Sequence, residues 1–440
     1  MKRVIRRNKI IILFLIYLFL VSLFAIPSTL CQTSSPSPTP IPIASFFISP
    51  VYASNMTLYG PASINYDGSK IAFVANANNH RQLFVVNSDG TGLKQLTADS
   101  REYSFPYING DDRKIVCISY KDNTLPDGYH YGSDFRLVMF NSDGTNLITL
   151  VSNQVDLDVV QPSTSRDGTK VTFRAYPANT SNADRDNRLA LYVINSDGTG
   201  LAKLASNLFE IGVIEASPDI SGDGSKIVFT ANIHDGKAIF IINSDGTGLK
   251  ELAQNSYDPG NNWKYPQISD DGSKVVFSAY SIDSYKIFVV NSDATGLRQI
   301  AQSPTKIKYY EGYENPSIDG DGDKVVFNSY IEKNGGGGSR NIFVMNSDGT
   351  GLEQITSNVS LFQSISGDGK KIVYTWQNGI YIVQLTADST PSATPTTNPT
   401  NTAFPSLTVP EFSWLAILPL FFSILSIAVL TRKRKVSLIK

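Results

Sequence analysis

The side chains best suited to chemistry in this 440-residue sequence are aromatic, and they gather in a few irregular segments. Three of these segments read "GYHYGSDF" from Gly128, "NNWKY" from Asn261 and "KIKYYEGYE" from Lys306. Aromatic rings that carry a polar group can stack on sugars or hold a peptide segment. We therefore predict a ligand-binding surface that comprises Tyr103, Tyr129, His130, Tyr131, Trp263, Tyr265, Tyr309, Tyr310 and Tyr313.

Catalysis has little support in the residue pattern. The sequence has no Gly-x-Ser-x-Gly motif, and its three histidines, His80, His130 and His234, lack the short spacing of metal ligands. A metal-dependent lyase or hydrolase acting on polysaccharide would require His130 and His234 to converge in the fold. We predict no catalytic residue and no cofactor, and a carbohydrate-active or peptidase-like enzyme is the alternative.

One acidic segment begins like a calcium-binding loop. The phrase "DGDGDK" supplies Asp319, Asp321 and Asp323 at the spacing of the first three ligands. Lys324 then stands where such a loop needs glycine, and Tyr330 stands where it needs a bidentate glutamate. We therefore predict a hairpin turn here and no metal site.

Two short phrases recur along the sequence and indicate the fold. Variants of "DGSK" occur seven times, at Asp67, Asp112, Asp167, Asp223, Asp271, Asp321 and Asp368. Variants of "NSDGTGL" occur six times, from Asn87, Asn141, Asn195, Asn243, Asn291 and Asn346. Asp-Gly pairs favour tight hairpin turns, and the period of about 45 to 55 residues is typical of propeller blades.

Each repeat contains four short strands, and the second and third are almost entirely apolar, as in "KIVFTAN" and "KAIFIIN". Such strands are covered on both faces, as happens when blades stack on one another. The seventh repeat stops after its third strand, and an unassigned segment, 45–60, precedes the first repeat. We predict an all-β, seven-bladed β-propeller of four-stranded antiparallel blades, closed by a strand from that segment. Six blades and a leftover half-repeat are the alternative.

The repeats resemble those of the TolB-like, WD-repeat-like propeller family. The resemblance rests on phrases such as "DGSKIAFV" and "LFVVNSDGTGLKQLT", and it covers residues 61 to 386. It implies the fold and says little about function. TolB itself carries a further α/β domain before its propeller, and the sequence before Pro61 is too short for one. The bacterial envelope role of TolB is therefore not expected to carry over.

The two kinds of turn are expected at one end of the ring, because the strands of a blade are antiparallel. We call the end that carries the Asp-Gly turns the DG rim, and the end that carries the irregular segments the loop rim. Loops on a rigid scaffold often bind ligands, so we place the predicted binding surface on the loop rim. In the alternative interpretation, these aromatic rings only fill gaps between blades.

The two ends of the sequence carry apolar segments beside basic residues. Residues 1–31 are predicted to be a signal peptide or an N-terminal anchor, and residues 410–440 a transmembrane helix with a basic cytoplasmic tail. The segments 32–45 and 387–409 are rich in Pro, Ser and Thr, and we predict a linker and a stalk on either side of the propeller, 46–386.

The C-terminal segment resembles the anchors of archaeal surface proteins with a Pro-Glu-Phe signature, here Pro410, Glu411 and Phe412. This resemblance implies cleavage by a sortase-like enzyme. We predict a cell-membrane protein whose propeller is extracellular. Sequons for N-glycosylation at Asn55, Asn179 and Asn358 fit that location.

The distribution of charge argues against nucleic acid as a partner. Ten of the 38 basic residues stand beside the two apolar terminal stretches. Without these ten the chain has 28 basic against 39 acidic residues, a net charge of about −11. Such a surface repels phosphate backbones. The expected partners are the membrane, through the C-terminal helix, and an extracellular glycan, peptide or envelope protein that is bound without catalysis. A structural role in a surface layer is a further alternative.

Overall fold

A computed structural model describes residues 48–53, 57–111, 113–124, 130–152, 155–157, 162–177, 189–205, 218–233, 236–254, 262–281, 284–302, 315–332, 338–356, 362–376 and 379–385. Several predictions lie outside these residues: Tyr129, Tyr309, Tyr310, Tyr313, His234, Asn55, Asn179, Asn358 and both terminal segments. Among the described residues, no helix is long and apolar enough to span a membrane.

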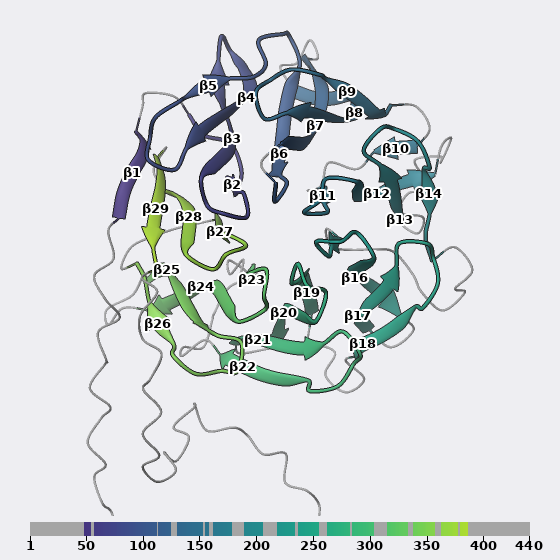
Figure 1. Cartoon of the computed structure of the whole chain (residues 1–440), viewed down its shortest axis with the longest axis vertical. Coiled ribbons are helices and arrows are strands. Elements are labelled where there is room, and N and C mark those ends of the chain that lie inside the picture. The colour runs from purple at the N-terminus through teal and green to yellow at the C-terminus, as the bar shows by residue number, and fades with distance from the viewer. Residues whose placement is uncertain are drawn as a thin grey trace, which may run out of the picture. The chain divides into compact units, whose positions relative to one another are not determined.

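The described strands form seven antiparallel sheets, which we number as blades 1 to 7 (Figure 1). Blade 1 contains β2 (Ser63–Ile64), β3 (Lys70–Ala77), β4 (His80–Asn87) and β5 (Lys94–Gln95), and blade 2 contains β6 (Glu102–Ile108), β7 (Lys114–Thr124), β8 (His130–Asn141) and β9 (Ile148–Val151). Blade 3 contains β10 (Val155–Leu157), β11 (Ser163–Thr164), β12 (Lys170–Pro177), β13 (Ala190–Asn195) and β14 (Ala202–Lys203). Blade 4 contains β15 (Asp219–Ile220), β16 (Lys226–Ile233), β17 (Gly236–Asn243) and β18 (Lys250–Gln254).

The remaining blades repeat this arrangement. Blade 5 contains β19 (Asn262–Ile268), β20 (Lys274–Ser281), β21 (Ser284–Asn291) and β22 (Arg298–Gln302), and blade 6 contains β23 (Ser317–Ile318), β24 (Lys324–Glu332), β25 (Gly338–Asn346) and β26 (Glu353–Gln354). Blade 7 contains β27 (Phe362–Ile365), β28 (Lys371–Trp376), β29 (Gly379–Gln384) and β1 (Ile48–Ala53). In blade 3 the place of the first strand is divided, because β10 and β11 both pair with β12, at different parts of it. The predicted seven-bladed propeller of four-stranded blades is confirmed, and the six-blade alternative is wrong.

The strand that closes the ring comes from the segment before the first repeat. β1 pairs antiparallel with β29, with Ile48 opposite Val383 and Ala53 opposite Gly379. Strands from the two ends of the propeller therefore share one sheet, and β1 covers the edge that β29 would otherwise expose. The predicted closure of the last blade is confirmed.

The second and third strands of six blades share one stacked pair of aromatic rings. The pairs are Phe73–Phe84, Phe173–Tyr192, Phe229–Phe240, Phe277–Phe288, Phe327–Phe343 and Tyr374–Tyr381, with ring centroids 5.3 to 5.6 Å apart. Blade 2 has Cys117 opposite Val138 at this position. Cys117 is fully buried, so the expectation that it is a core residue is confirmed.

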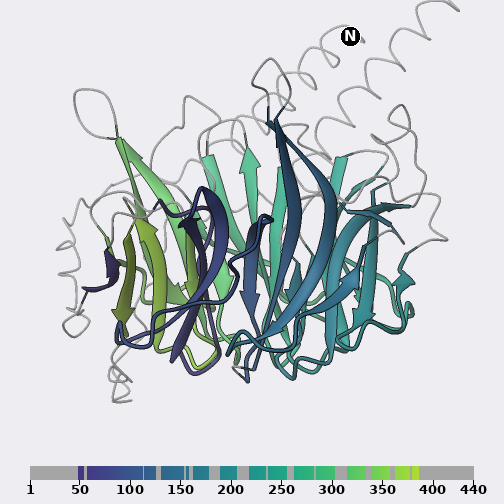
Figure 2. The ribbon, with the colours of Figure 1, turned by 90° about the horizontal axis from the view of Figure 1, so that it is seen from above.

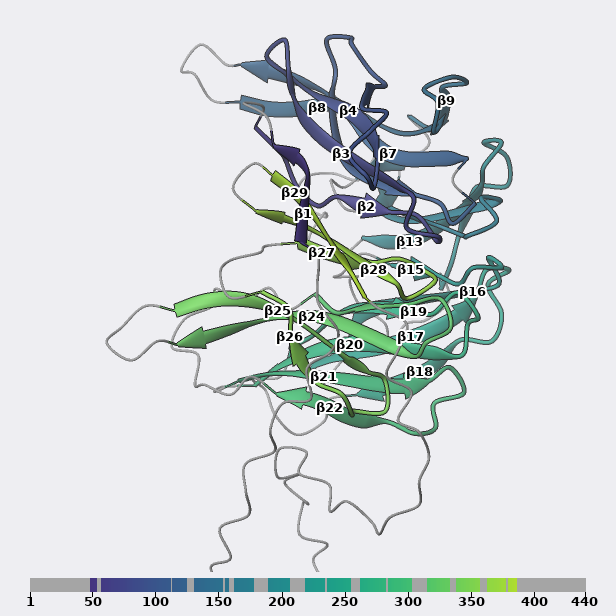
Figure 3. The same cartoon turned by 60° about the vertical axis from the view of Figure 1, so that its left-hand side comes forward.

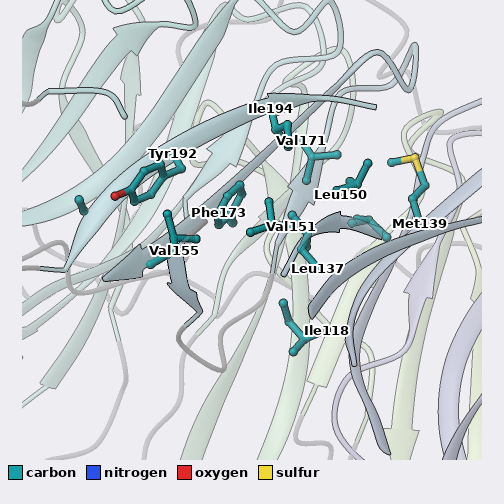
Figure 4. Packing of buried hydrophobic residues seen from close by; sticks show 13 residues of the cluster. Ile118, Leu137, Met139, Leu150, Val151, Val155, Val171, Phe173, Tyr192 and Ile194 are labelled. Atoms are coloured by element: carbon teal, nitrogen blue, oxygen red, sulfur yellow. The ribbon is translucent and has the colours of Figure 1, made fainter. Parts of the chain in front are cut away.

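Apolar side chains also fill the spaces between neighbouring blades. Figure 4 shows the cluster between blades 2 and 3, in which Leu137 and Met139 of β8 lie near Val171 and Phe173 of β12. Similar clusters join the other blades, and the last of the series places Val373 and Ile380 of blade 7 against residues of blade 1. The core is therefore a set of interfaces between blades, which explains why the central strands are apolar on both faces.

The two recurring turns lie together at one end of the ring, as predicted. The backbone N–H of Ser88, in the first "NSDGTGL" turn, donates to the backbone oxygen of Ser69, in the first "DGSK" turn, at 2.7 Å. The Asp67 carboxylate accepts from the N–H of Ser69 at 2.8 Å, and Gly68 adopts a φ of 67° that glycine tolerates best. Figure 2 shows the described turns at this DG rim, while the β7–β8 and β24–β25 hairpins project at the opposite loop rim (Figure 3).

A lysine from the "DGSK" turn joins each of several blades to the next one. The Nζ atoms of Lys114, Lys170, Lys226, Lys274, Lys324 and Lys371 donate to glycine carbonyls or serine hydroxyls in the turns of the following blade. Lys371 completes the circle, because its Nζ donates to the Gly68 carbonyl and to the Ser88 hydroxyl, each at 2.9 Å. We call these bonds the lysine contacts.

We predict that Lys371→Met lowers the free energy of unfolding by about 1 to 3 kcal/mol, because it removes two charge-assisted hydrogen bonds between blades 7 and 1. Urea denaturation followed by tryptophan fluorescence would measure the change. Lys370→Met is the matched control, because Lys370 is exposed and pairs only with Asp368 of its own turn among the described residues. Its effect should stay within about 0.5 kcal/mol. Equal stability of the two variants would contradict this role for Lys371.

Candidate functional site

A pocket of about 310 Å³ lies on the axis of the propeller. Residues from the innermost strands of all seven blades line it: β2, β6, β11, β15, β19, β23 and β27. Figure 1 shows these strands around the centre of the ring. We call this space the axial pocket, and because each blade contributes the same short stretch, its chemistry depends on the residues that differ between repeats.

Aromatic rings line the part of the axial pocket nearest the loop rim. Phe105 and Tyr265 stand at the middle of β6 and β19, and Phe362 begins β27. Each lies two residues before the polar lining residue of the same strand. Phe105 and Tyr265 have backbone φ values of 52° and 54°, and each lies where the strand pairing shifts register. A left-handed backbone is uncommon for bulky residues and is found preferentially at functional sites.

A ring of polar side chains lies midway along the axial pocket. The equivalent residues of the seven repeats are Ser63, Tyr107, Ser163, Asp219, Gln267, Ser317 and Ser364. Several of them bridge blades: the Ser63 hydroxyl accepts from the N–H of Ile108 at 3.2 Å, and Asp219 Oδ2 accepts from the N–H of Ile268 at 3.0 Å. Asp219 is the only carboxylate in this ring.

Asp219 is almost completely buried, at 9% exposure. Its Oδ1 atom accepts a hydrogen bond of 2.6 Å from the Ser163 hydroxyl. Burial raises the pKa of Asp219 to about 6, although the hydrogen bonds from Ser163 and from the N–H groups of Ile268 and Ile220 oppose that shift.

Three side chains occupy the axis at the DG rim. The residues just before the seven Asp-Gly turns are Tyr66, Gly110, Arg166, Gly222, Asp270, Gly320 and Gly367. The Arg166 guanidinium carbon lies 3.3 Å from the centre of the Tyr66 ring. A Cβ atom at Gly320 would lie 2.7 Å from Tyr66 Cε2 and 3.0 Å from an Asp270 carboxylate oxygen, so the glycine leaves room for both side chains. The four glycines therefore allow Tyr66, Arg166 and Asp270 to meet at this end of the pocket.

The two carboxylates of the axial pocket influence one another. Burial raises the pKa of Asp270 to about 6, the Arg166 guanidinium lowers it and the charge of Asp219 raises it. Burial also raises the pKa of Tyr107, and the charges of Asp219 and Asp270 raise it further. These groups come from different blades and face the same space.

The structure describes only some of the predicted binding residues. Tyr265 lines the axial pocket. Its role in ligand binding stays a prediction. Trp263 lies on β19 opposite Ala279, while His130 and Tyr131 begin β8 opposite Thr124 and Asn123, at the loop-rim end of the hairpin.

Tyr103 does not fit the predicted binding surface. Its side chain is 2% exposed and packs between blades 1 and 2, in the cluster that contains Cys117 and Phe140. The Tyr103 hydroxyl donates to the Asp99 carboxylate at 3.0 Å. The ring therefore fills a gap between blades, which is the alternative interpretation for this residue.

Sequence reasoning missed Asp219, Asp270, Arg166 and Tyr66. The signal was present in the repeats, because the position before the Asp-Gly turn is glycine in four of them and a large side chain in the other three. Residues that break a repeat on the axis of a propeller face one another, whichever blade they come from. Aligning the seven repeats would have found this group.

In the described part of the chain, no three or more His, Cys, Asp or Glu side chains lie close enough together to hold a metal ion. The calcium-like segment forms a hairpin turn, as predicted. In it, Asp319 Oδ1 accepts from the N–H groups of Asp323 and Lys324, at 2.7 and 3.0 Å.

Comparison with known proteins gives structural similarity only. No protein-family model matches the sequence, and no curated protein sequence matches it. The structure is similar to an oligogalacturonate lyase from Vibrio parahaemolyticus, with a TM-score of 0.57 and 13% identity over 78% of this chain and 97% of that one. An oligogalacturonate lyase in complex with manganese has a TM-score of 0.57 and 14% identity over 77% of this chain and 93% of that one.

TolB from Acinetobacter baumannii is also similar, with a TM-score of 0.43 and 16% identity over 72% of this chain and 64% of that one. At these identities the similarities to the two lyases show the propeller fold alone. They carry no conclusion about the substrate or activity of this chain.

We predict that the buried carboxyl groups make the propeller less stable as the pH rises. The pKa of Asp219 is about 6 in the folded state, above the ordinary 3.8, so the stabilising protonated form is fully present below 3.8 and is lost as the pH rises through 6. The free energy of unfolding should fall by up to roughly 3 kcal/mol for this carboxyl between about pH 4 and pH 7. Urea denaturation across that range would measure it.

Asp219→Asn should remove only part of this pH dependence, because Asp270 also has a pKa raised to about 6. Asp321→Asn, at an exposed turn, should keep all of it. An unchanged slope in Asp219→Asn would show that the protonation of Asp219 is not linked to folding.

Proposed function

We propose that this chain is a membrane-anchored, cell-surface propeller that binds an extracellular glycan, peptide or envelope protein without catalysis. The single observation that supports binding is the axial pocket, which is lined by aromatic rings towards the loop rim and by polar groups further in. Small ligands usually bind in concave sites where apolar walls meet convergent polar groups, and the axial pocket offers both. Anchoring rests on the apolar terminal segments of the sequence.

Access to the axial pocket is proposed from the loop rim. Tyr66, Arg166 and Asp270 meet on the axis at the other end, and backbone hydrogen bonds join neighbouring blades there, such as that from the N–H of Asp368 to the Tyr66 carbonyl at 2.8 Å. The volume of about 310 Å³ is at the lower limit for ligand sites. It suits one sugar unit or one side chain better than the middle of a polymer.

An enzymatic function is the second candidate. The observation that favours it is the presence of two carboxyl groups, Asp219 and Asp270, whose pKa values are raised to about 6 in one pocket. Such groups can serve as a general acid and a general base in glycoside hydrolysis. A release of reducing ends from bound oligosaccharides that disappears in Asp219→Asn and Asp270→Asn would support a hydrolase. Binding without turnover would support the non-catalytic role.

The first experiment is a glycan and peptide array probed with the fragment 46–388, which spans the propeller. We expect at least one class of ligand to bind. A blank array would contradict the binding function and would favour a structural role in a surface layer.

We predict that Tyr265→Ala weakens binding of the array ligand by about tenfold or more, because it removes an aromatic contact from the axial pocket. Trp263→Ala and the double variant Tyr309→Ala/Tyr310→Ala test the predicted loop-rim surface in the same way. Leu147→Ala is the control, because Leu147 is 55% exposed and lies in a DG-rim turn. Titration by fluorescence or calorimetry would give the affinities, and circular dichroism would confirm folding. Unchanged affinity in all three loop-rim variants would contradict the assignment.

A further inference from the structure

The charges that line the axial pocket do not balance. Asp219 and Asp270 contribute two carboxylates, and Arg166 contributes the one basic side chain among the described lining residues. The effect of both carboxylates on Tyr107 shows that they act on the same space. A buried charge is normally paired, and the described lining residues supply one basic group for two carboxylates.

Asp219 is the carboxylate without a basic partner. Its hydrogen bonds come from the Ser163 hydroxyl and the N–H groups of Ile268 and Ile220, and the described residues place no lysine, arginine or histidine in contact with it. A carboxylate has about four acceptor sites, so it can accept a further hydrogen bond. At pH 7.5 a carboxyl with a pKa of about 6 is mostly ionised, so Asp219 keeps both charge and acceptor capacity for a ligand.

The axial pocket already holds one organic cation of its own. The Arg166 guanidinium lies over the face of Tyr66, at 3.3 Å from the ring centre, and its charge acts on Asp270. A ring face and a carboxylate together are a favourable environment for a cation. This group at the DG rim shows that the lining can accommodate a guanidinium.

The part of the axial pocket nearest the loop rim also combines aromatic rings with a carboxylate, and the described lining residues place no basic side chain there. Tyr265 and Phe105 lie two residues before Gln267 and Tyr107, which stand at the level of Asp219 in their own blades. Two residues of a strand span about 6 to 7 Å. A cation that enters from the loop rim would therefore pass the aromatic rings and reach Asp219 within the length of a long side chain.

We propose that the axial pocket binds a guanidinium or ammonium group, supplied by an arginine or lysine side chain of a peptide, between the rings of Phe105 and Tyr265 and the carboxylate of Asp219. This inference rests on the proposed function, because it names the ligand class of the same pocket. The net charge of about −10 outside the terminal segments would favour the approach of basic peptides. A polyanionic ligand such as a uronate chain would instead meet an unpaired negative charge.

The test compares matched charged and neutral probes on the full chain in a neutral detergent, by isothermal titration calorimetry at pH 7.5. Nα-acetyl-L-argininamide is paired with Nα-acetyl-L-citrullinamide, which replaces the guanidinium by a neutral urea of similar shape. The acetyl group removes the α-ammonium charge from both probes. A disaccharide of glucosamine is paired with its N-acetylated form, and a galacturonate disaccharide is the anionic probe. We expect argininamide to bind at least about tenfold more tightly than citrullinamide.

Asp219→Asn should remove this preference for charge, and Asp321→Asn, an equal change of charge at an exposed turn, should retain it. Equal affinity of wild-type protein for argininamide and citrullinamide would overturn the proposal even if Asp219→Asn failed to fold. Binding of the glucosamine disaccharide alone would overturn the peptide source and keep the cation.

The proposed function and the cation inference can fail separately. If the array yields a neutral or anionic ligand that competes for the axial pocket and no cationic probe binds, the cation inference is wrong and the binding function stands. If the array is blank and no probe binds, both are wrong.

Discussion

The hydrogen bond from one lysine to the turn of the next blade is the interaction on which the propeller most depends. It recurs at Lys114, Lys226 and Lys371, among others, and each Nζ ends on a carbonyl or hydroxyl of the neighbouring blade. Charge-assisted bonds of this kind are stronger than neutral ones. Apolar packing between blades is not directional. The lysine hydrogen bonds require specific distances and angles, and they therefore fix the position of one blade relative to the next.

The lysine contacts recur at six of the seven junctions between blades, among the described residues, and equivalent residues of the seven repeats line the axial pocket. Small changes in the sequence therefore have a large effect on the axial pocket. Replacing a serine by Asp219 introduces a buried charge, and replacing glycine by Tyr66, Arg166 and Asp270 fills the DG rim. The scaffold stays uniform while a few positions determine what the pocket can bind.

The fold was predictable because its causes are local and repeated. Asp67 and Gly68 specify a turn, Phe73 and Phe84 specify a covered strand pair, and the same pattern returns in later repeats. The candidate site was only partly predictable, because Asp219 and Tyr107 meet through the curvature of the ring and not through spacing in the sequence. Tyr103 was wrongly expected at the binding surface. It is an aromatic residue near a loop, but its ring fills buried space beside the small Cys117.

The pairing of β1 with β29 has a consequence for how the chain matures. Ile48 lies opposite Val383, so β1 can form its native pairing only after β29 has been synthesised. A contact of such long range costs chain entropy and slows folding. During biosynthesis β1 therefore lacks its native partner until the final repeat has left the ribosome. Until then it is accessible to chaperones and to non-native strand pairing.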